Sequence, residues 1–493
     1  MNPMKILAFI LSVFLLLLAI ALYFPEGGIN ITKNFKLKFF TSEDIFSKKS
    51  IRYADISYII NKNELLTDSI ISQLVGNPGD EHTEKFDTVK ANADSLIKII
   101  QTIEYPDGNN AVLFPVFKAL EGLKASNKLI RVMHYGDSQI EGDRMTCLIR
   151  NKLQNRFGGS GIGLIPASQL YDYKFSMIQE SSDNWLRYTV YGDRDSTIMH
   201  NRYGVLGSFC MFSPYETDSR IADTSNYQAW ISFEKSKYAY SNTGNFTQCR
   251  IFYGYNNAPF INEIYRDNIL IDADLIPPTH RLNVIKWTFD EPQSSITLKF
   301  KGSYSPEIYA IALDSKSGVA VDNVAMRGCS GTVFTQIDSE LLQEMYKLLN
   351  VKLIILQFGG NVVPYIVENY RYYENWFYGQ LMRIKQVCPD VSIIVIGLAD
   401  MSVKEKDKYI TSPNLNKVRN ALKNATFRAG AAYWDMYKAM GGENSMPSWV
   451  LAEPPLAAKD FVHFNPRGAN IIAQMFYNSF IYEYNKFEKI DRK

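Results

Sequence analysis

The stretch RVMHYGDSQIEGDR, residues 131–144, decides how the rest of this sequence is interpreted. An apolar run ends abruptly at Gly136-Asp137-Ser138, and acidic residues and a further glycine follow directly. This pattern is typical of a buried strand that ends in a tight turn before a helix, which we expect over residues 141–157. The pattern therefore predicts a serine just beyond the carboxyl end of a strand.

Further strand and helix patterns follow the same order toward the C-terminus. The apolar runs VKLIILQF, VSIIVIGL and AAYWDM each precede a segment with the apolar periodicity of a helix. Buried β-branched runs that alternate with amphipathic helices predict an α/β fold, with a parallel sheet covered by helices on both faces. Ligands bind at the carboxyl ends of the strands in such a sheet, so Ser138 is expected at an active-site position.

Two other parts of the chain have a different residue pattern. Residues 185–312 contain short alternating runs, such as QAWISF and ITLKF, split by turn residues, which predicts an inserted β-sandwich. Residues 26–125 are polar and mostly helical in pattern, so we expect an N-terminal extension there. The α/β domain is accordingly expected in two parts, residues 126–184 and 313–493.

The N-terminus, residues 1–25, contains an uncharged apolar run from Ile6 to Phe24. Such a run would form a helix of about 28 Å, which is close to the hydrocarbon thickness of a bilayer. Ala19-Ile20-Ala21 fits a signal-peptide cleavage site, but the apolar run continues beyond it, which favours an uncleaved anchor. With either outcome we expect the rest of the chain to be exported.

Composition limits the classes of function. The formal net charge is only +2, so no strong positive field indicates nucleic acid as a partner. The five cysteines lie far apart without a CxxC pair, which argues against a zinc site and supports no disulfide framework. We therefore expect neither a metal nor nucleic acid.

A serine hydroxyl becomes a nucleophile when a base takes its proton, and that base needs an orienting acid. His463 follows the last predicted strand and directly precedes the final helix, and Asp460 stands three residues earlier. His134 lies within the first predicted strand, where a core role is the simpler interpretation. The other histidines lie in the extension or the insertion: His82, His200 and His280. Elimination therefore favours Ser138, His463 and Asp460.

The sequence resembles the SGNH/GDSL hydrolases in four blocks. YGDSQIEGDR resembles their Gly-Asp-Ser block, and DFVHFNPRGA resembles their Asp-x-x-His block before a helix. RGCSGTVF resembles the block with a glycine after the second strand, with Gly331 the better match and Gly328 the runner-up. QFGGNVV resembles the Gly-x-Asn-Asp block, in which Asn361 matches and Val362 departs from the usual acidic residue.

This resemblance implies a three-layer α/β/α sandwich and a role for each matching residue. Ser138 would attack an ester carbonyl, and His463 would act as general base and then as general acid. Asp460 would orient the imidazole. The amides of Ser138 and Gly331, with the side chain of Asn361, would form the oxyanion hole. The resemblance implies no cofactor and no metal.

The longer phrase HYGDSQIEGDR, together with FGGSGIGL and a β-rich insertion, is similar to bacterial peptidoglycan O-acetylesterases. Their inserted module resembles a carbohydrate-binding domain. This implies removal of O-acetyl groups from a cell-envelope glycan, either peptidoglycan or a surface polysaccharide, at the periplasmic face of the inner membrane or in the envelope. Aromatic residues of the insertion could stack on sugars, although a core role is the simpler interpretation of each: Trp185, Tyr227, Trp230, Tyr253, Tyr255 and Trp287.

Three alternatives stay open at this point. An O-acetyltransferase of the same fold would pass the acetyl group to a polysaccharide, beside a membrane acyltransferase partner, through the same covalent intermediate. A lipase or thioesterase fits the polar insertion less well. A non-catalytic glycan-binding protein would be supported by loss of Ser138, Asp460 or His463, and all three are present.

Overall fold

The computed structural model describes residues 3–25, 29–32, 35–37, 39, 52–62, 101–170, 175–215 and 226–491. The chain forms two compact units, Met1–Arg52 and Tyr53–Lys493, and each is described by itself. Much of the predicted N-terminal extension and His82 lie outside the described residues.

In the first unit, α1 (Pro3–Tyr23) is an apolar helix of 21 residues. It is the one helix in the described ranges that is long and apolar enough to cross a membrane. The same unit contains a short antiparallel pair, β1 (Ile29–Thr32) and β2 (Phe35–Leu37). The expected apolar N-terminal helix is therefore present, and its length and composition suit a signal anchor.

The second unit is built on a five-stranded parallel sheet with the order β15-β3-β16-β17-β20. The chain runs from β3 to β15 on one side and then to β16 on the other, so the connection changes direction between β3 and β16. Ligands bind at such a switch point in α/β sheets. The strands are β3 (Leu129–Gly136), β15 (Gly318–Ala325), β16 (Val351–Gln357), β17 (Ser392–Ile396) and β20 (Ala432–Trp434).

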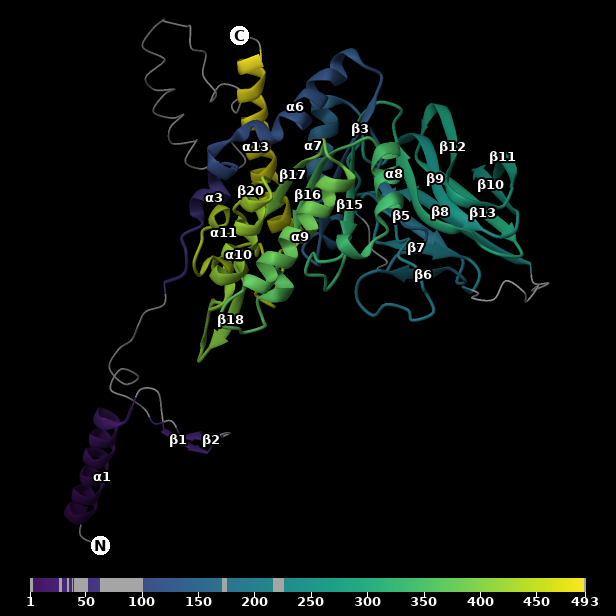
Figure 1. Cartoon of the computed structure of the whole chain (residues 1–493). Coiled ribbons are helices and arrows are strands. Elements are labelled where there is room, and N and C mark those ends of the chain that lie inside the picture. Colours follow the sequence, from purple (N-terminus) through teal and green to yellow (C-terminus); the bar gives the residue numbers. More distant parts are fainter. Residues whose placement is uncertain are drawn as a thin grey trace, which may run out of the picture. The chain divides into compact units, whose positions relative to one another are not determined.

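Helices cover both faces of this sheet (Figure 1). Alternate side chains of β3 enter different cores, Met133 and Tyr135 on one face and Ile130 and Val132 on the other. The first core includes α8 (Ser339–Leu349), α9 (Arg371–Val387) and α10 (Leu415–Arg428), and the second includes α6 (Phe114–Glu121), α7 (Thr146–Phe157) and α13 (Pro466–Asp491). The predicted three-layer α/β/α sandwich is confirmed.

Short elements complete this part of the chain. The hairpin of β18 and β19 lies between β17 and α10 in the chain, and several short helices lie in the loops. These elements are α3 (Ser57–Lys62), η2 (Pro106–Gly108), η3 (Asn110–Leu113), η4 (Gly122–Ala125), η5 (Glu141–Asp143), η6 (Phe334–Gln336), η7 (Gly360–Val362), β18 (Ser402–Glu405), β19 (Lys408–Thr411), α11 (Met436–Ala439) and α12 (Ser445–Leu451).

Between α7 and β15 the chain forms two antiparallel sheets that enclose a third core, as the predicted β-sandwich requires. Strands β4 and β5 precede residue 185, so the sheets begin earlier in the chain than the predicted range 185–312; the domain limits themselves stay predictions. One sheet contains β5 (Met177–Ser181), β8 (Tyr227–Lys235), β13 (Ser295–Gly302), β10 (Phe260–Arg266) and β11 (Ile269–Ile276). The other contains β6 (Leu186–Thr189), β7 (Ser208–Met211), β14 (Glu307–Asp314), β9 (Phe246–Asn256) and β12 (Thr279–Gln293), with β4 (Gly163–Ile165) paired to β14.

The insertion packs directly against the parallel-sheet domain. Every residue of β14 is buried, because one side contacts the sandwich core and the other contacts the core that contains α8 and α9. A buried ion-pair cluster crosses the same boundary: Arg131 on β3 pairs with Asp322 on β15 and with Asp314 on β14. The insertion is therefore fixed to the sheet rather than attached by a linker.

We predict that Arg131→Met destabilises the protein by about 3–5 kcal/mol, because it leaves the buried Asp322 without its cation and removes one of the two arginines paired with the buried Asp314. The control is Lys124→Met, which removes the exposed partner of Glu488 and should cost less than about 1 kcal/mol. Chemical unfolding of both variants measures the difference. Equal losses would show that the buried cluster contributes no more than a surface ion pair.

Candidate active site

The serine turn begins where β3 ends, between the ends of its two neighbouring strands. Gly136 pairs with Ala325 of β15 on one side and with Gln357 of β16 on the other. A Cβ at Gly136 would lie within 3.0 Å of Ile140 and of the Gln357 carbonyl oxygen, so this position requires glycine. The chain then turns, and Ser138 lies partly buried at the carboxyl edge of the sheet.

The structure brings together the three residues predicted to form the triad. Ser138 Oγ lies 2.8 Å from His463 Nε2, and His463 Nδ1 lies 2.7 Å from Asp460 Oδ2. Asp460 Oδ1 also accepts hydrogen bonds from the backbone N–H groups of Val462 and His463, at 2.9 and 3.0 Å. The three side chains form one continuous hydrogen-bonded chain from the hydroxyl to the carboxylate.

The hydrogen bonds around Asp460 keep its carboxyl charged. Burial alone would raise the pKa of Asp460, but the hydrogen bonds from the backbone and ring of His463 outweigh it, and the pKa lies below its usual value. A charged carboxylate on Nδ1 favours the tautomer in which Nε2 accepts the serine proton. The arrangement is therefore suited to activating Ser138 for nucleophilic attack.

Gln139 and Arg144, which follow Ser138 in the chain, hold the serine turn against the loop that carries His463. Arg144 donates to the carbonyls of Ser138 and Phe464, and Gln139 Nε2 donates to the carbonyl of Val462 at 2.6 Å. Both residues belong to the stretch 131–144, but the sequence alone predicts no role for them. Their roles depend on contacts with a loop more than 300 residues away in the sequence, which no local pattern reveals.

A further contact shapes the loop between Asp460 and His463. Phe461 has a φ of 59°, an uncommon conformation for a residue with a side chain. Its ring stacks on Tyr409 of β19, with the centroids 3.5 Å apart and the planes within 7° of parallel. Its carbonyl accepts a hydrogen bond from Ser402 N at 3.0 Å. The β18–β19 hairpin thus holds the loop that presents the imidazole.

The predicted oxyanion residues Gly331 and Asn361 meet at Cys329. Gly331 N–H donates to Cys329 Sγ at 3.3 Å, and Asn361 Nδ2 donates to the Cys329 carbonyl oxygen at 3.1 Å. Gly331 is buried with a φ of 78°, and a Cβ there would lie 2.8 Å from the ring of Phe358. The runner-up Gly328 is exposed, and a Cβ added there would have no neighbouring atom within 4 Å. The surroundings of Gly331 therefore require glycine for packing as well as for conformation.

Asp137 and His134 lie behind the serine and are buried. Asp137 Oδ1 accepts from Gln139 N at 3.0 Å, and Asp137 Oδ2 accepts from Asn361 Nδ2 at 3.4 Å. Burial raises the pKa of Asp137 to about 6 and lowers the pKa of His134 to about 4. His134 is hydrogen-bonded on both ring nitrogens, to Thr146 and Gln357, so it has a structural role in the core.

The described part of the chain contains no group of three or more His, Cys, Asp or Glu side chains that could hold a metal ion. The chemistry that these residues can perform themselves is nucleophilic acyl transfer: a serine, a base bonded to it, and an acid that orients the base.

We predict a pH-dependent difference in stability between the parent protein and Asp137→Asn. The folded protein binds the Asp137 proton more tightly than the unfolded chain, because the pKa rises from 3.8 to about 6 on folding. The stabilisation from this proton is complete below the unfolded pKa and is lost as the pH rises through the folded pKa. The stability of the parent relative to the variant should therefore fall by up to about 3 kcal/mol between about pH 4 and pH 7. Unfolding curves across this range test it, and a constant difference would contradict it.

Comparison with known proteins finds one matching family model and solved structures of similar fold. Residues 294–471 match the GDSL-like Lipase/Acylhydrolase family. This range contains Gly331, Asn361, Asp460 and His463, whereas Ser138 lies before it. Among curated proteins, none matches the sequence significantly.

A solved structure of a peptidoglycan O-acetylesterase is similar over 79% of this chain and 99% of its own, with a TM-score of 0.59 and 18% identity. This likeness shows a shared fold. The acetyl xylan esterase AlAXEase covers 32% of this chain and 80% of its own at 13% identity, with a TM-score of 0.25. A carbohydrate esterase family 2 enzyme with a carbohydrate-binding domain, from Corynascus thermopiles (Myceliophthora fergusii), covers 53% of this chain and 95% of its own at 12% identity, with a TM-score of 0.23. No conclusion about this chain follows from the last two.

Proposed function

We propose that this chain, which matches the GDSL-like Lipase/Acylhydrolase family over residues 294–471, is a serine esterase that removes O-acetyl groups from a cell-envelope glycan. The observation that carries the proposal is the hydrogen-bonded chain of Ser138, His463 and Asp460 at the carboxyl edge of the parallel sheet. This constellation is recognised by its geometry and its roles, because it recurs on unrelated folds.

In the proposed reaction, His463 Nε2 takes the proton of Ser138 as Oγ attacks the acetyl carbonyl carbon. Asp460 stabilises the imidazolium that results. When the tetrahedral intermediate collapses, the bond to the sugar oxygen breaks and His463 donates the proton to that oxygen. Water then attacks the acetyl-serine by the same route in reverse, which releases acetate and restores the hydroxyl of Ser138.

We assign the oxyanion hole to the amides of Ser138 and Gly331 and to the side chain of Asn361. The partner of Gly331 N–H in the structure is a thiol sulfur, which is a weak acceptor, so an oxyanion would compete well for this donor. Asn361 Nδ2 makes its longer bond, 3.4 Å, with Asp137 Oδ2, and that bond is the easier one to exchange. Preorganised donors of this kind contribute about 3–4 kcal/mol each to lowering the barrier.

The glycan substrate is proposed from the insertion and from the fold shared with a peptidoglycan O-acetylesterase. Trp185, Tyr253 and Trp287 are buried in the sandwich core, so stacking on sugars is not open to them. Trp230 on β8 is 39% exposed and lies in a shallow depression beside Lys299. An exposed indole flanked by polar side chains suits the apolar face of a sugar ring. Peptidoglycan is therefore the first substrate to test.

The location is proposed from α1. A signal anchor of this length would hold the remainder of the chain at the periplasmic face of the inner membrane, next to the envelope glycan.

In the transferase alternative a sugar hydroxyl replaces water as the acceptor, and a membrane acyltransferase would be the partner. Acetate release measured with and without added sugar acceptors separates the two reactions.

We predict that Ser138→Ala, His463→Ala and Asp460→Asn each lower hydrolysis of p-nitrophenyl acetate and of O-acetylated peptidoglycan by several orders of magnitude. Each removes one member of the hydrogen-bonded chain, and binding and oxyanion assistance alone would remain. Steady-state rates of the full chain in detergent measure the loss, with circular dichroism as the control for folding. A Ser138→Ala protein as active as the parent would exclude Ser138 as the nucleophile.

We predict that Asn361→Ala lowers kcat by about 100-fold and changes KM much less, because the donor acts chiefly on the oxyanion. Gln336→Ala, on an exposed turn of the neighbouring loop, serves as the control and should leave both constants unchanged. If Asn361→Ala instead raised KM with kcat unchanged, Asn361 would be a substrate-binding residue.

A further inference from the structure

The loop that carries the proposed base lies at the surface of the protein. The side chains of Asp460 and His463 are 48% and 30% exposed, so packing holds them on one side only. The direct link between the reacting groups is the hydrogen bond from Ser138 Oγ to His463 Nε2, at 2.8 Å. This bond depends on the hydroxyl proton of Ser138, which the proposed reaction removes.

In the acetyl-enzyme, Oγ of Ser138 carries the acetyl group in place of its proton, so it can no longer donate to His463. Hydrolysis nevertheless needs His463 at the same place. A water gives a proton to Nε2 as its oxygen bonds to the acetyl carbon, the bond from that carbon to Oγ breaks, and His463 returns the proton to Oγ. Contacts that do not involve the reacting atoms must therefore hold the imidazole at this stage.

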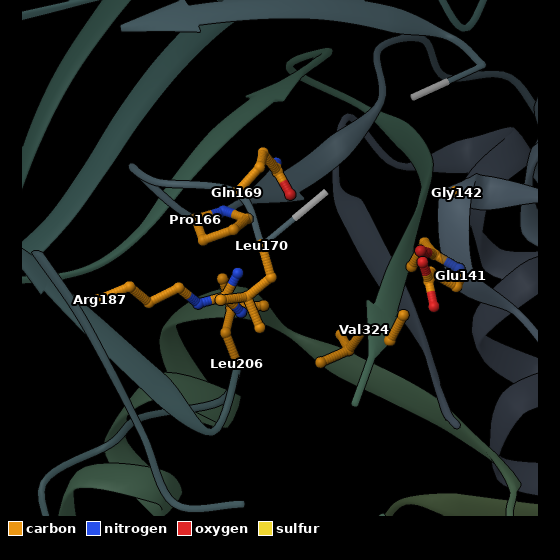
Figure 2. A pocket seen from close by; sticks show the side chains of 10 residues that line it. Glu141, Gly142, Pro166, Gln169, Leu170, Arg187, Leu206 and Val324 are labelled. Atoms are coloured by element: carbon orange, nitrogen blue, oxygen red, sulfur yellow. The ribbon is translucent and has the colours of Figure 1, made fainter. Parts of the chain in front are cut away.

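The serine turn offers a fixed support, because it is bonded to the strand and loop beside it. Asn323 Nδ2 on β15 donates to the Ile140 carbonyl at 2.9 Å, and Arg327 Nε donates to Glu141 Oε2 at 2.9 Å. Figure 2 shows Glu141 and Arg187 on opposite sides of a pocket with a volume of about 30 Å³. This pocket has room for water and none for a sugar ring.

Arg144 connects this turn to the histidine loop through three backbone carbonyls. Its Nε donates to the Glu141 carbonyl at 2.9 Å, and its Nη2 donates to the Ser138 carbonyl. On the other side, Nη1 donates to the carbonyl of Phe464, the residue after His463, at 3.2 Å. A planar guanidinium with five N–H groups can bond carbonyls in several directions at once, which a lysine cannot match.

Gln139 makes a second connection on the opposite side of the imidazole. Its Nε2 donates at 2.6 Å to the carbonyl of Val462, the residue before His463. The two side chains thus hold the backbone on both sides of His463. All the acceptors are main-chain carbonyls, and none of these atoms is consumed or released in the proposed reaction. Both connections therefore persist in the acetyl-enzyme.

We propose that Arg144 and Gln139 are positioning residues for the second half of the reaction, in which they hold His463 beside acetylated Ser138 after the direct hydrogen bond has been lost. The inference rests on the proposed function and adds a separate requirement for hydrolysis of the intermediate. Loss of either side chain slows deacetylation of Ser138 more than its acetylation, because in the free enzyme the bond between Ser138 and His463 still aligns the pair.

The test is Arg144→Ala, assayed as the full chain in detergent on p-nitrophenyl acetate. The constant kcat/KM reports formation of the acetyl-enzyme, whereas kcat also includes its hydrolysis. We expect kcat to fall by about 100-fold and kcat/KM by less than about tenfold, since a misplaced catalytic group costs about this much. A rapid burst of p-nitrophenol should precede the slow steady state, and mass spectrometry of acid-quenched samples should show more acetyl-Ser138 than in the parent.

Two further variants keep the test open if Arg144→Ala does not fold. Arg144→Lys retains a cation that bonds fewer of the carbonyls, so its kcat should lie between those of the parent and Arg144→Ala. Gln139→Met removes the donor at similar volume and should also lower kcat more than kcat/KM. The matched control is Arg156→Ala, which removes a hydrogen bond to Asn485 near the opposite end of α7 from the serine turn and should leave both constants unchanged.

Parent-like constants for the Arg144 and Gln139 variants would overturn the inference while the esterase proposal stood. Equal losses of kcat and kcat/KM without accumulation of acetyl-Ser138 would also overturn it, because they would indicate a general structural role. A loss in Arg156→Ala as large as that in Arg144→Ala would have the same consequence. If the parent itself did not hydrolyse p-nitrophenyl acetate, the proposed function would be wrong, and this inference with it.

Discussion

The hydrogen bond between Ser138 Oγ and His463 Nε2 joins two segments that lie 325 residues apart in the sequence. It requires the carboxyl end of β3 and the loop before α13 to lie close together. The parallel sheet brings them to the same edge, and the side chains of Gln139 and Arg144 hold the serine turn to the histidine loop. A displacement of about 1 Å at a catalytic site is costly, so we expect these supporting contacts to matter for the proposed reaction.

The same edge gathers the remaining parts of the site. Because β16 lies beside β3, its loop brings Asn361 against Asp137, and the loop after β15 brings Gly331 under Phe358. Cys329 is bonded to both Gly331 and Asn361, through its sulfur and its carbonyl oxygen. The proposed oxyanion donors are thus arranged as one unit across three neighbouring strands, although they come from distant positions in the chain.

The insertion packs as part of the same folded unit as the parallel sheet. Its strand β14 is buried on both sides, and the Arg131 cluster crosses from the parallel sheet into the sandwich. The surface of the insertion is consequently held at a constant position relative to Ser138. This rigidity is what would allow remote sugar units to contribute to the rate on a polymer.

Much of the fold and the proposed catalytic residues could be predicted from the sequence, because the patterns that indicate them are local. A strand that stops at Gly-Asp-Ser and an Asp three residues before a His are readable without a structure, and the alternation of strands with helices predicts which edge they share. The clamps by Gln139 and Arg144 and the stacking of Tyr409 on Phe461 were not predicted, since each depends on a pairing across the fold that no short window contains. A core role was the simpler interpretation of each aromatic residue of the insertion, and Trp185, Tyr253 and Trp287 are indeed buried. The exposure of Trp230 could not be predicted, because alternate positions of a strand differ only in which face they join.

The covalent intermediate is the most direct test of this account. The full chain is mixed with O-acetylated peptidoglycan, quenched rapidly with acid and digested, and the peptides are examined by mass spectrometry. The proposed mechanism predicts that the peptide containing Ser138 gains the mass of one acetyl group, located on Ser138, and that His463→Ala abolishes this addition. Release of acetate with no acetyl group on Ser138, or with the acetyl group on another residue, would contradict it.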